Sequence, residues 1–245
     1  MAIADIKAQT VTLPNSDIGL QAYLAQPTNG KTYPGIIVVQ EIFGVNDHIK
    51  DITERIAKEG YIAIAPAIYQ RQAPGFAVGY SDEEVTEGRK HKVQTKASEL
   101  LADIQAAIDY LYKLPNIKTE GVGTVGFCFG GHVVYLAATL PQVKATASFY
   151  GAQIATWCPG EDAPTIERTK DITGKVYCFF GTEDPLIPNE QTEQIEAELQ
   201  RQQIPHKVYR YEEVSHGFMC DRRASYDKAA ADDAWVKMLD LFSQI

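Results

Sequence analysis

Hydrophobic positions follow two different periods along this chain. Short stretches in which apolar residues alternate with polar ones, or directly follow one another, predict strands at residues 9–13, 20–26, 35–39, 61–65, 122–126, 143–150, 176–180 and 207–211. Stretches with an apolar side chain every three or four residues predict helices that contain residues 47–58, 100–111, 131–139, 190–201 and 229–242. Two remaining segments follow neither period and are expected to be irregular, namely residues 66–94 and 151–172.

The order of these elements predicts an α/β fold, with a mostly parallel central sheet and helices on both of its faces. The first two strands, joined by a turn at residues 14–17, give this sheet an antiparallel start. No repeat or linker divides the chain, so residues 1–245 are interpreted as one domain. In such sheets, function gathers in loops beyond the carboxyl ends of strands, which here are residues 40–46, 127–131, 181–188 and 214–218.

Charge and composition narrow the choice of partners. The chain of 245 residues carries 32 acidic side chains against 23 Lys and Arg, and a net charge of −9 argues against binding to nucleic acid. No apolar run approaches the ~20 residues that cross a bilayer, and the first residues do not resemble a signal peptide. We therefore expect a cytoplasmic protein without nucleic-acid or membrane partners. Its oligomeric state stays open, with a monomer favoured.

One of the four cysteines lies in a motif that indicates chemistry. Cys128 is flanked by Gly126 and Gly130–Gly131, between a predicted buried strand and a predicted helix. This is the setting of a nucleophile elbow, a sharp turn that lifts the nucleophile out of the sheet. The alternative is a glycine-rich loop around a buried, inert cysteine. The cysteines are too sparse for a disulfide scaffold and form no zinc-binding spacing with the histidines, and no role is predicted for Cys158, Cys178 and Cys220.

A nucleophile needs a base and a group that orients the base. Asp184 and His216 follow the next predicted strands, in the order that this fold uses, so all three side chains are expected at one edge of the sheet. Taken alone, Asp184 could begin a helix and His216 could occupy a surface turn. Glu183 is a weaker candidate for the acid than Asp184. The other histidines are less suited, because they lie inside a helix, on polar helical stretches or at a strand start: His132, His48, His91 and His206.

Several segments together resemble the dienelactone hydrolases, also called carboxymethylenebutenolidases, which have the α/β-hydrolase fold. The matching segments are Gly126-Phe-Cys-Phe-Gly-Gly, Gly181-Thr-Glu-Asp, Tyr211-Glu-Glu-Val-Ser-His-Gly-Phe, Gln40-Glu-Ile-Phe-Gly and Tyr69-Gln-Arg-Gln-Ala-Pro-Gly. The resemblance covers almost the whole chain. The cysteine elbow combined with the Gln-Glu-Ile-Phe-Gly loop is what makes it specific.

The resemblance implies a role for each residue of this site. Cys128 would be the nucleophile, His216 the base and Asp184 the residue that orients it. The backbone amides of Phe129 and Ile42 would form the oxyanion hole. Glu41 would keep the resting thiol protonated and take its proton when substrate binds, a role that is compatible with a salt bridge to a nearby arginine. No metal or cofactor is required by this mechanism.

The resemblance also implies a substrate carboxylate that is bound by arginine. Arg71 matches a family arginine with that role, although it could equally be an ordinary surface residue. The family has a second such arginine four residues after the catalytic histidine, where this chain has Cys220. Arg222 and the adjacent Arg223 are candidates to replace it. This departure leaves open whether dienelactones themselves are substrates.

These inferences predict a cysteine-dependent hydrolase of small esters or lactones that acts through a thioester. Its substrate would be anionic if Arg71 and Arg222 have the roles that the resemblance implies. Two alternatives stay open. The scaffold could be catalytically silent and act as a binding module. A cysteine redox enzyme ranks last, because no second cysteine lies near Cys128 in the sequence.

Overall fold

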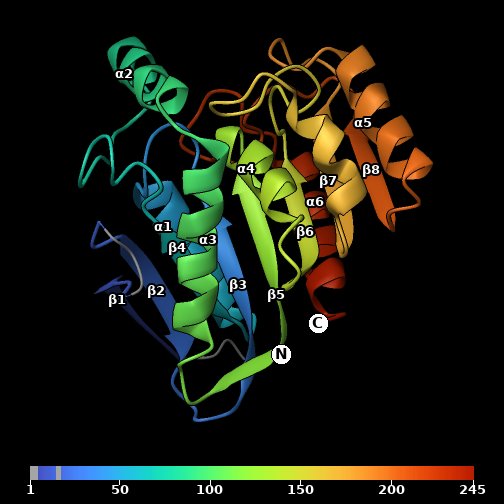
Figure 1. The fold of residues 1–245 in the computed structure, drawn as a ribbon. Coiled ribbons are helices and arrows are strands. Elements are labelled where there is room, and N and C mark those ends of the chain that lie inside the picture. The colour runs from blue at the N-terminus through green and yellow to red at the C-terminus, as the bar shows by residue number, and fades with distance from the viewer. Residues whose placement is uncertain (1–4, 15–17) are drawn as a thin grey trace.

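Eight strands form a single sheet in the order β1-β2-β4-β3-β5-β6-β7-β8 (Figure 1). The computed structural model describes residues 5–14 and 18–245. Strand β2 runs antiparallel to both of its neighbours, and all strand pairs from β4 to β8 are parallel. The strands are β1 (Ile6–Thr12), β2 (Gln21–Pro27), β3 (Tyr33–Val39), β4 (Ile62–Pro66), β5 (Ile117–Phe127), β6 (Val143–Phe149), β7 (Lys175–Gly181) and β8 (His206–Tyr211).

Alternate residues of the central strands face two separate apolar layers. In β3, Ile36 and Val38 pack in the same cluster as α1 (Asp47–Lys58) and α6 (Lys228–Phe242). Ile37 and Val39 belong to the opposite layer. That layer contains α3 (Ala97–Leu111) and part of α4 (Phe129–Ala137), and Figure 1 shows both helices in front of the sheet. Because both faces are covered, the central strands read as continuous apolar runs.

The expected order of strands and helices is confirmed. The helix predicted at residues 47–58 is α1, and the helix predicted at residues 190–201 lies within α5 (Asn189–Arg201). Strand β5 begins earlier than predicted, because its first residues pair with β3 before a shift in register. Part of the turn predicted at residues 14–17, namely residues 15–17, lies outside the described residues.

The expectation that residues 66–94 and 151–172 are irregular is wrong in part. The first segment contains α2 (Asp82–Val93), and the second contains a short 3-10 helix, η1 (Thr165–Asp171). Only Gly88 of α2 is buried, so the helix has no apolar stripe that periodicity could reveal. Its start is marked instead by a capping box between Ser81 and Glu84. Figure 1 shows α2 standing away from the sheet, beyond the strand ends.

Within the described ranges, none of the helices is both long enough and apolar enough to span a membrane.

Candidate active site

The turn between β5 and α4 holds Cys128 in a backbone conformation that residues with side chains rarely adopt. Its φ is 55° and its ψ is −115°, and the residue is the N-cap of α4. Such a conformation costs on the order of 1–3 kcal/mol and persists only where surrounding structure enforces it. The turn has the strand-to-helix geometry that the motif predicts for a nucleophile elbow.

Glycines allow the elbow to pack against its neighbours. A Cβ at Gly126 would lie 2.0 Å from the carbonyl oxygen of Gly130. A Cβ at Gly130 would lie 2.3 Å from the carbonyl oxygen of Val39 and 2.4 Å from that of Gln40. The absence of side chains therefore lets the loop after β3 approach the elbow, and this loop carries Glu41 and Ile42.

Asp184 and His216 come together as an ion pair at the same edge of the sheet. Asp184 follows β7, His216 follows β8, and both are buried. His216 Nδ1 lies 2.7 Å from Asp184 Oδ2, and the other carboxylate oxygen accepts a hydrogen bond of 2.8 Å from the Leu186 amide. The carboxylate is thus fixed by the backbone and in turn fixes the imidazole.

The second ring nitrogen of His216 is free for chemistry. Nε2 has no hydrogen bond of normal geometry within the described part of the chain. Burial alone lowers the pKa of His216, but the nearby Cys128 sulfur and the hydrogen bond to Asp184 outweigh it and raise the pKa to about 10. A negative charge on the Cys128 sulfur therefore favours the protonated imidazole, which can act as a proton donor.

Cys128 and His216 open into one cavity of about 420 Å³. Ile42 and Phe129 also line it. In the described loops and helix caps, the backbone amide of neither residue donates a hydrogen bond. The remaining lining residues are mainly apolar or cationic: Phe43, Val85, Arg89, Lys92, Val93, Ala152, Gln153, Trp157, Leu186 and Arg223. This cavity can hold a small molecule against the sulfur and two backbone donors.

Glu41 lies buried beside this cavity and is paired with one of the two candidate arginines. Its Oε1 accepts a hydrogen bond of 3.1 Å from Arg223 Nη1, while Oε2 is buried without a hydrogen-bond partner among the described residues. Burial raises the pKa of Glu41, and the charges of Arg223 and His216 oppose that rise. A buried carboxylate with one free oxygen is suited to accept a proton.

Arg71 and Arg222, the two arginines predicted to bind substrate, do not line the cavity. Arg71 lies in an ion pair of 3.0 Å with Asp103. Arg222 is half-exposed and lies 3.3 Å from Asp47, where it lines a different hollow. The expected substrate contacts of both therefore find no support in this geometry.

Arg223 lines the cavity in place of Arg222, and two further cations come from α2. Lys92 Nζ lies 4.7 Å from the centre of the Trp157 ring and hydrogen bonds to Gln153. Burial lowers the pKa of Lys92, which Cys128 partly counteracts. Arg89 lies one turn earlier on α2 and also lines the cavity. Lys92 and Arg89 were not among the predicted site residues, because residues 66–94 were expected to be irregular.

The sheet order, the helices on both faces and the strained turn after β5 define an α/β-hydrolase fold. The sequence pattern of the dienelactone hydrolase family matches residues 20–245, and the chain belongs to that family. A curated relative from Synechocystis sp., named "Putative carboxymethylenebutenolidase", is 57% identical over 97% of each chain. A relative of the same name from Yersinia pestis is 35% identical over 95% of this chain and 86% of its own.

A crystal structure from Klebsiella pneumoniae agrees with this assignment. It is named "Putative Dienelactone Hydrolase", superposes with a TM-score of 0.89 and is 30% identical, covering 98% of this chain and all of its own. The expected family and fold are therefore confirmed, and the chain is a carboxymethylenebutenolidase-like hydrolase.

Proposed function

We propose that this protein hydrolyses small esters or lactones through a thioester formed on Cys128. The observation that carries the proposal is the shared cavity. Cys128, on its strained elbow, and His216, which is paired with the buried Asp184, line the same small space. The free amides of Ile42 and Phe129 are candidates for the oxyanion hole, which usually contributes several kcal/mol to transition-state stabilisation.

Glu41 starts the reaction in this proposal. Its free Oε2 takes the proton of the Cys128 thiol when substrate enters, and the resulting thiolate attacks the carbonyl carbon. The oxyanion is held by the two amides. Asp184 and the thiolate that Glu41 generates both favour a protonated His216. Its imidazolium gives a proton to the leaving alkoxide as the carbon–oxygen bond breaks.

The second half of the reaction releases the acid. His216, now neutral, takes a proton from a water molecule, and the hydroxide attacks the thioester. The carbon–sulfur bond then breaks and returns Cys128 to its thiolate, which regains the proton held on Glu41. Asp184 keeps the imidazole in one tautomer through both halves.

The lining of the cavity supports an anionic substrate. Lys92, Arg89 and Arg223 place three positive charges around apolar walls, and Glu41 neutralises only one of them within hydrogen-bond distance. Carboxymethylenebutenolide, the compound in the name of the relatives, carries a carboxylate. We assign the carboxylate contact to Lys92, because its Nζ lies 4.7 Å from the centre of the Trp157 ring, which also lines the cavity.

The nucleophile is tested with Cys128→Ser and Cys128→Ala on a panel of p-nitrophenyl esters, dienelactones and small thioesters. We expect kcat/KM to fall by at least about a thousandfold in both variants. Mass spectrometry of acid-quenched wild-type protein should show an acyl group on Cys128. Cys178→Ser, which changes a thiol in the core, is the control. Full activity in Cys128→Ala would refute the proposal, and a wild-type Cys128 that neither turns over substrate nor reacts with iodoacetamide would favour a silent scaffold.

The charge preference is tested with Lys92→Gln against Lys90→Gln. Lys90 is on the same helix but pairs with Glu87 at the surface. We expect Lys92→Gln to raise KM for an anionic ester about tenfold and to leave KM for a neutral ester of the same size unchanged. Equal effects on both esters would exclude a carboxylate contact.

A further inference from the structure

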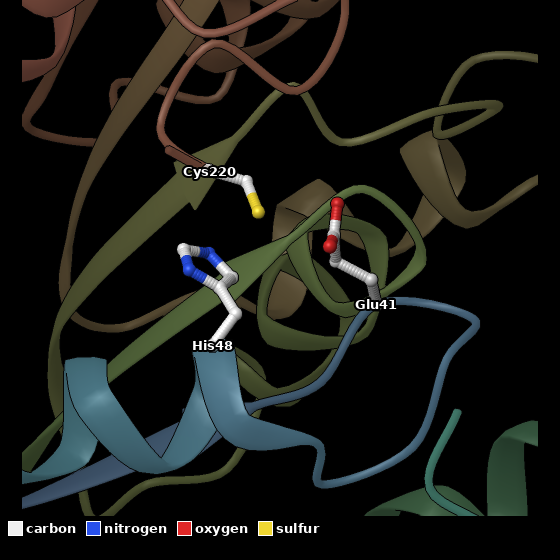
Figure 2. A group of neighbouring side chains, drawn as sticks. All are labelled: Glu41, His48 and Cys220. Atoms are coloured by element: carbon white, nitrogen blue, oxygen red, sulfur yellow. The ribbon is translucent and has the colours of Figure 1, made fainter. Parts of the chain in front are cut away.

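Three buried side chains lie close together, and only one of them, Glu41, has a part in the proposed hydrolysis. Glu41 comes from the loop after β3, His48 from the first turn of α1 and Cys220 from the segment after β8. Figure 2 shows the three side chains pointing toward a common space. Their potential ligand atoms all lie within 4.8 Å of one another, and all three residues are buried.

Two of these side chains present polar atoms that nothing satisfies. Glu41 Oε2 and His48 Nε2 are buried without a hydrogen-bond partner among the described residues. The Cys220 thiol donates a hydrogen bond of 3.2 Å to the Tyr80 hydroxyl. Leaving a buried polar atom unsatisfied costs on the order of 1–3 kcal/mol. A ligand in the space between them would satisfy both atoms.

We propose that Glu41, His48 and Cys220 form a binding site for a divalent transition-metal ion, with Zn²⁺ the best match. A thiolate, an imidazole and a carboxylate are the donor types of zinc sites, whereas Mg²⁺ and Ca²⁺ prefer oxygen ligands alone. Bonds of about 2.0–2.3 Å require the donors of a tetrahedral site to be slightly closer than they now are.

The charges of the site balance when the ion binds. The Cys220 thiol releases its proton to solvent, a bond forms between Sγ and the metal, and no atom is oxidised or reduced. Thiolate and carboxylate together then carry two negative charges against the two positive charges of the ion, and Arg223 adds one positive charge beside the site. Arg223 already occupies Oε1 of Glu41, so Oε2 is the oxygen that is available to the metal.

Metal binding would withdraw Glu41 from proton transfer. The oxygen that ligates the ion is the same atom that accepts the Cys128 proton in the proposed mechanism. We therefore expect Zn²⁺ to inhibit hydrolysis reversibly and chelators to restore it. This consequence rests on the proposed function, whereas the binding itself does not.

The site is tested by titrating the protein of residues 1–245 with Co²⁺, which reports thiolate ligation through a charge-transfer band in the near ultraviolet. We expect the band in wild-type protein and in Cys128→Ser, and its loss in Cys220→Ser. His48→Gln should weaken Co²⁺ binding at least tenfold, because it removes one ligand and keeps the thiolate. Circular dichroism and the Tm of each apo variant show whether the variant is folded.

The two thiols make the result decisive. A band that persists in Cys220→Ser and vanishes in Cys128→Ser would place the metal at the proposed nucleophile and overturn the site. The absence of any band in wild-type protein at millimolar Co²⁺ would do the same. If Cys220→Ser does not fold, an unchanged affinity in His48→Gln refutes the site. None of these spectra depends on hydrolysis, so failure of the proposed function would be seen separately.

Discussion

Replacement of Arg223 by methionine should destabilise this protein far more than the same replacement at Arg222. Arg223 lies 3.1 Å from Glu41, and its side chain is 23% exposed against 1% for the carboxylate. Arg222 lies 3.3 Å from Asp47, with side-chain exposures of 50% and 73%. The two adjacent arginines therefore form a matched pair, one with a buried partner and one with a solvated partner.

The size of the effect follows from what each replacement leaves behind. Removing one partner of a buried ion pair costs about 3–5 kcal/mol, because the other charge remains buried and unpaired. Partial hydration of Arg223 reduces that figure, so we expect Arg223→Met to lose about 3 kcal/mol of unfolding free energy. An exposed pair contributes about 0–1 kcal/mol, which is the expected loss for Arg222→Met.

The pH dependence gives this prediction a second readout. Burial raises the pKa of Glu41, and Arg223 opposes the rise, so the pKa should rise further in Arg223→Met. A carboxyl group whose pKa is higher in the folded state loses stability as pH rises through the interval between its unfolded and folded pKa values. The deficit of Arg223→Met should therefore be largest at neutral pH and shrink as pH is lowered toward 5.

Urea unfolding of the wild-type protein and both variants at several pH values measures these quantities. Glu41→Gln, made in the wild-type protein and in Arg223→Met, completes a double-mutant cycle. The coupling free energy between Glu41 and Arg223 in this cycle should exceed about 1 kcal/mol. The electrostatic account of this site fails if Arg223→Met and Arg222→Met lie within about 0.5 kcal/mol of each other at neutral pH.

Three further predictions address the site and its surroundings. Asp184→Asn should lower kcat/KM by about a thousandfold or more, because it removes the negative charge that fixes the imidazole of His216 in the proposed mechanism. Glu183→Gln next to it should have little effect, and equal losses would contradict this assignment. A Cβ at Gly88 would lie 2.3 Å from the Ile42 carbonyl oxygen, so Gly88→Ala should shift α2 or the loop after β3 that carries Ile42. We expect kcat/KM to fall by about 10–100-fold, and an unchanged rate would show that this packing does not position the loop. Burial lowers the pKa of His132 to about 4, so between pH 6.5 and 4 the unfolded chain binds a proton that the folded protein does not bind. The unfolding free energy should therefore fall on acidification by up to about 1.4 kcal/mol per pH unit. In urea titrations His132→Gln should lose this contribution, and a pH profile identical to that of the wild-type protein would refute the pKa shift.

The sheet was predictable from sequence because its strands are buried on both faces. Continuous apolar runs such as residues 35–39 have few structural alternatives, and the alternation with helical periods fixes the parallel topology. The helix α2 was not predictable in this way, because 11 of its 12 residues avoid burial. Its capping box was a local signal, although that signal marks only where a helix begins.

The candidate site likewise contains residues that the sequence could place and residues that it could not. Cys128, Asp184 and His216 could be placed because each lies in the loop that follows a strand, and parallel strands bring such loops to one edge. The cations could not be placed. Arg222 and Arg223 are adjacent in an irregular segment, where periodicity does not indicate which of them faces the cavity.

Glu41 is the residue at which the remaining features of the site meet. Arg223 holds Oε1, so all further chemistry of this carboxylate passes through Oε2. In the proposals above, that oxygen receives either the Cys128 proton or a metal ion, and it cannot receive both. The proposed mechanism and the proposed metal site therefore exclude each other at any moment, although they use the same fold. Because His48 and Cys220 act only on the metal, replacing either one should separate inhibition by Zn²⁺ from hydrolysis, whereas replacing Glu41 should abolish both.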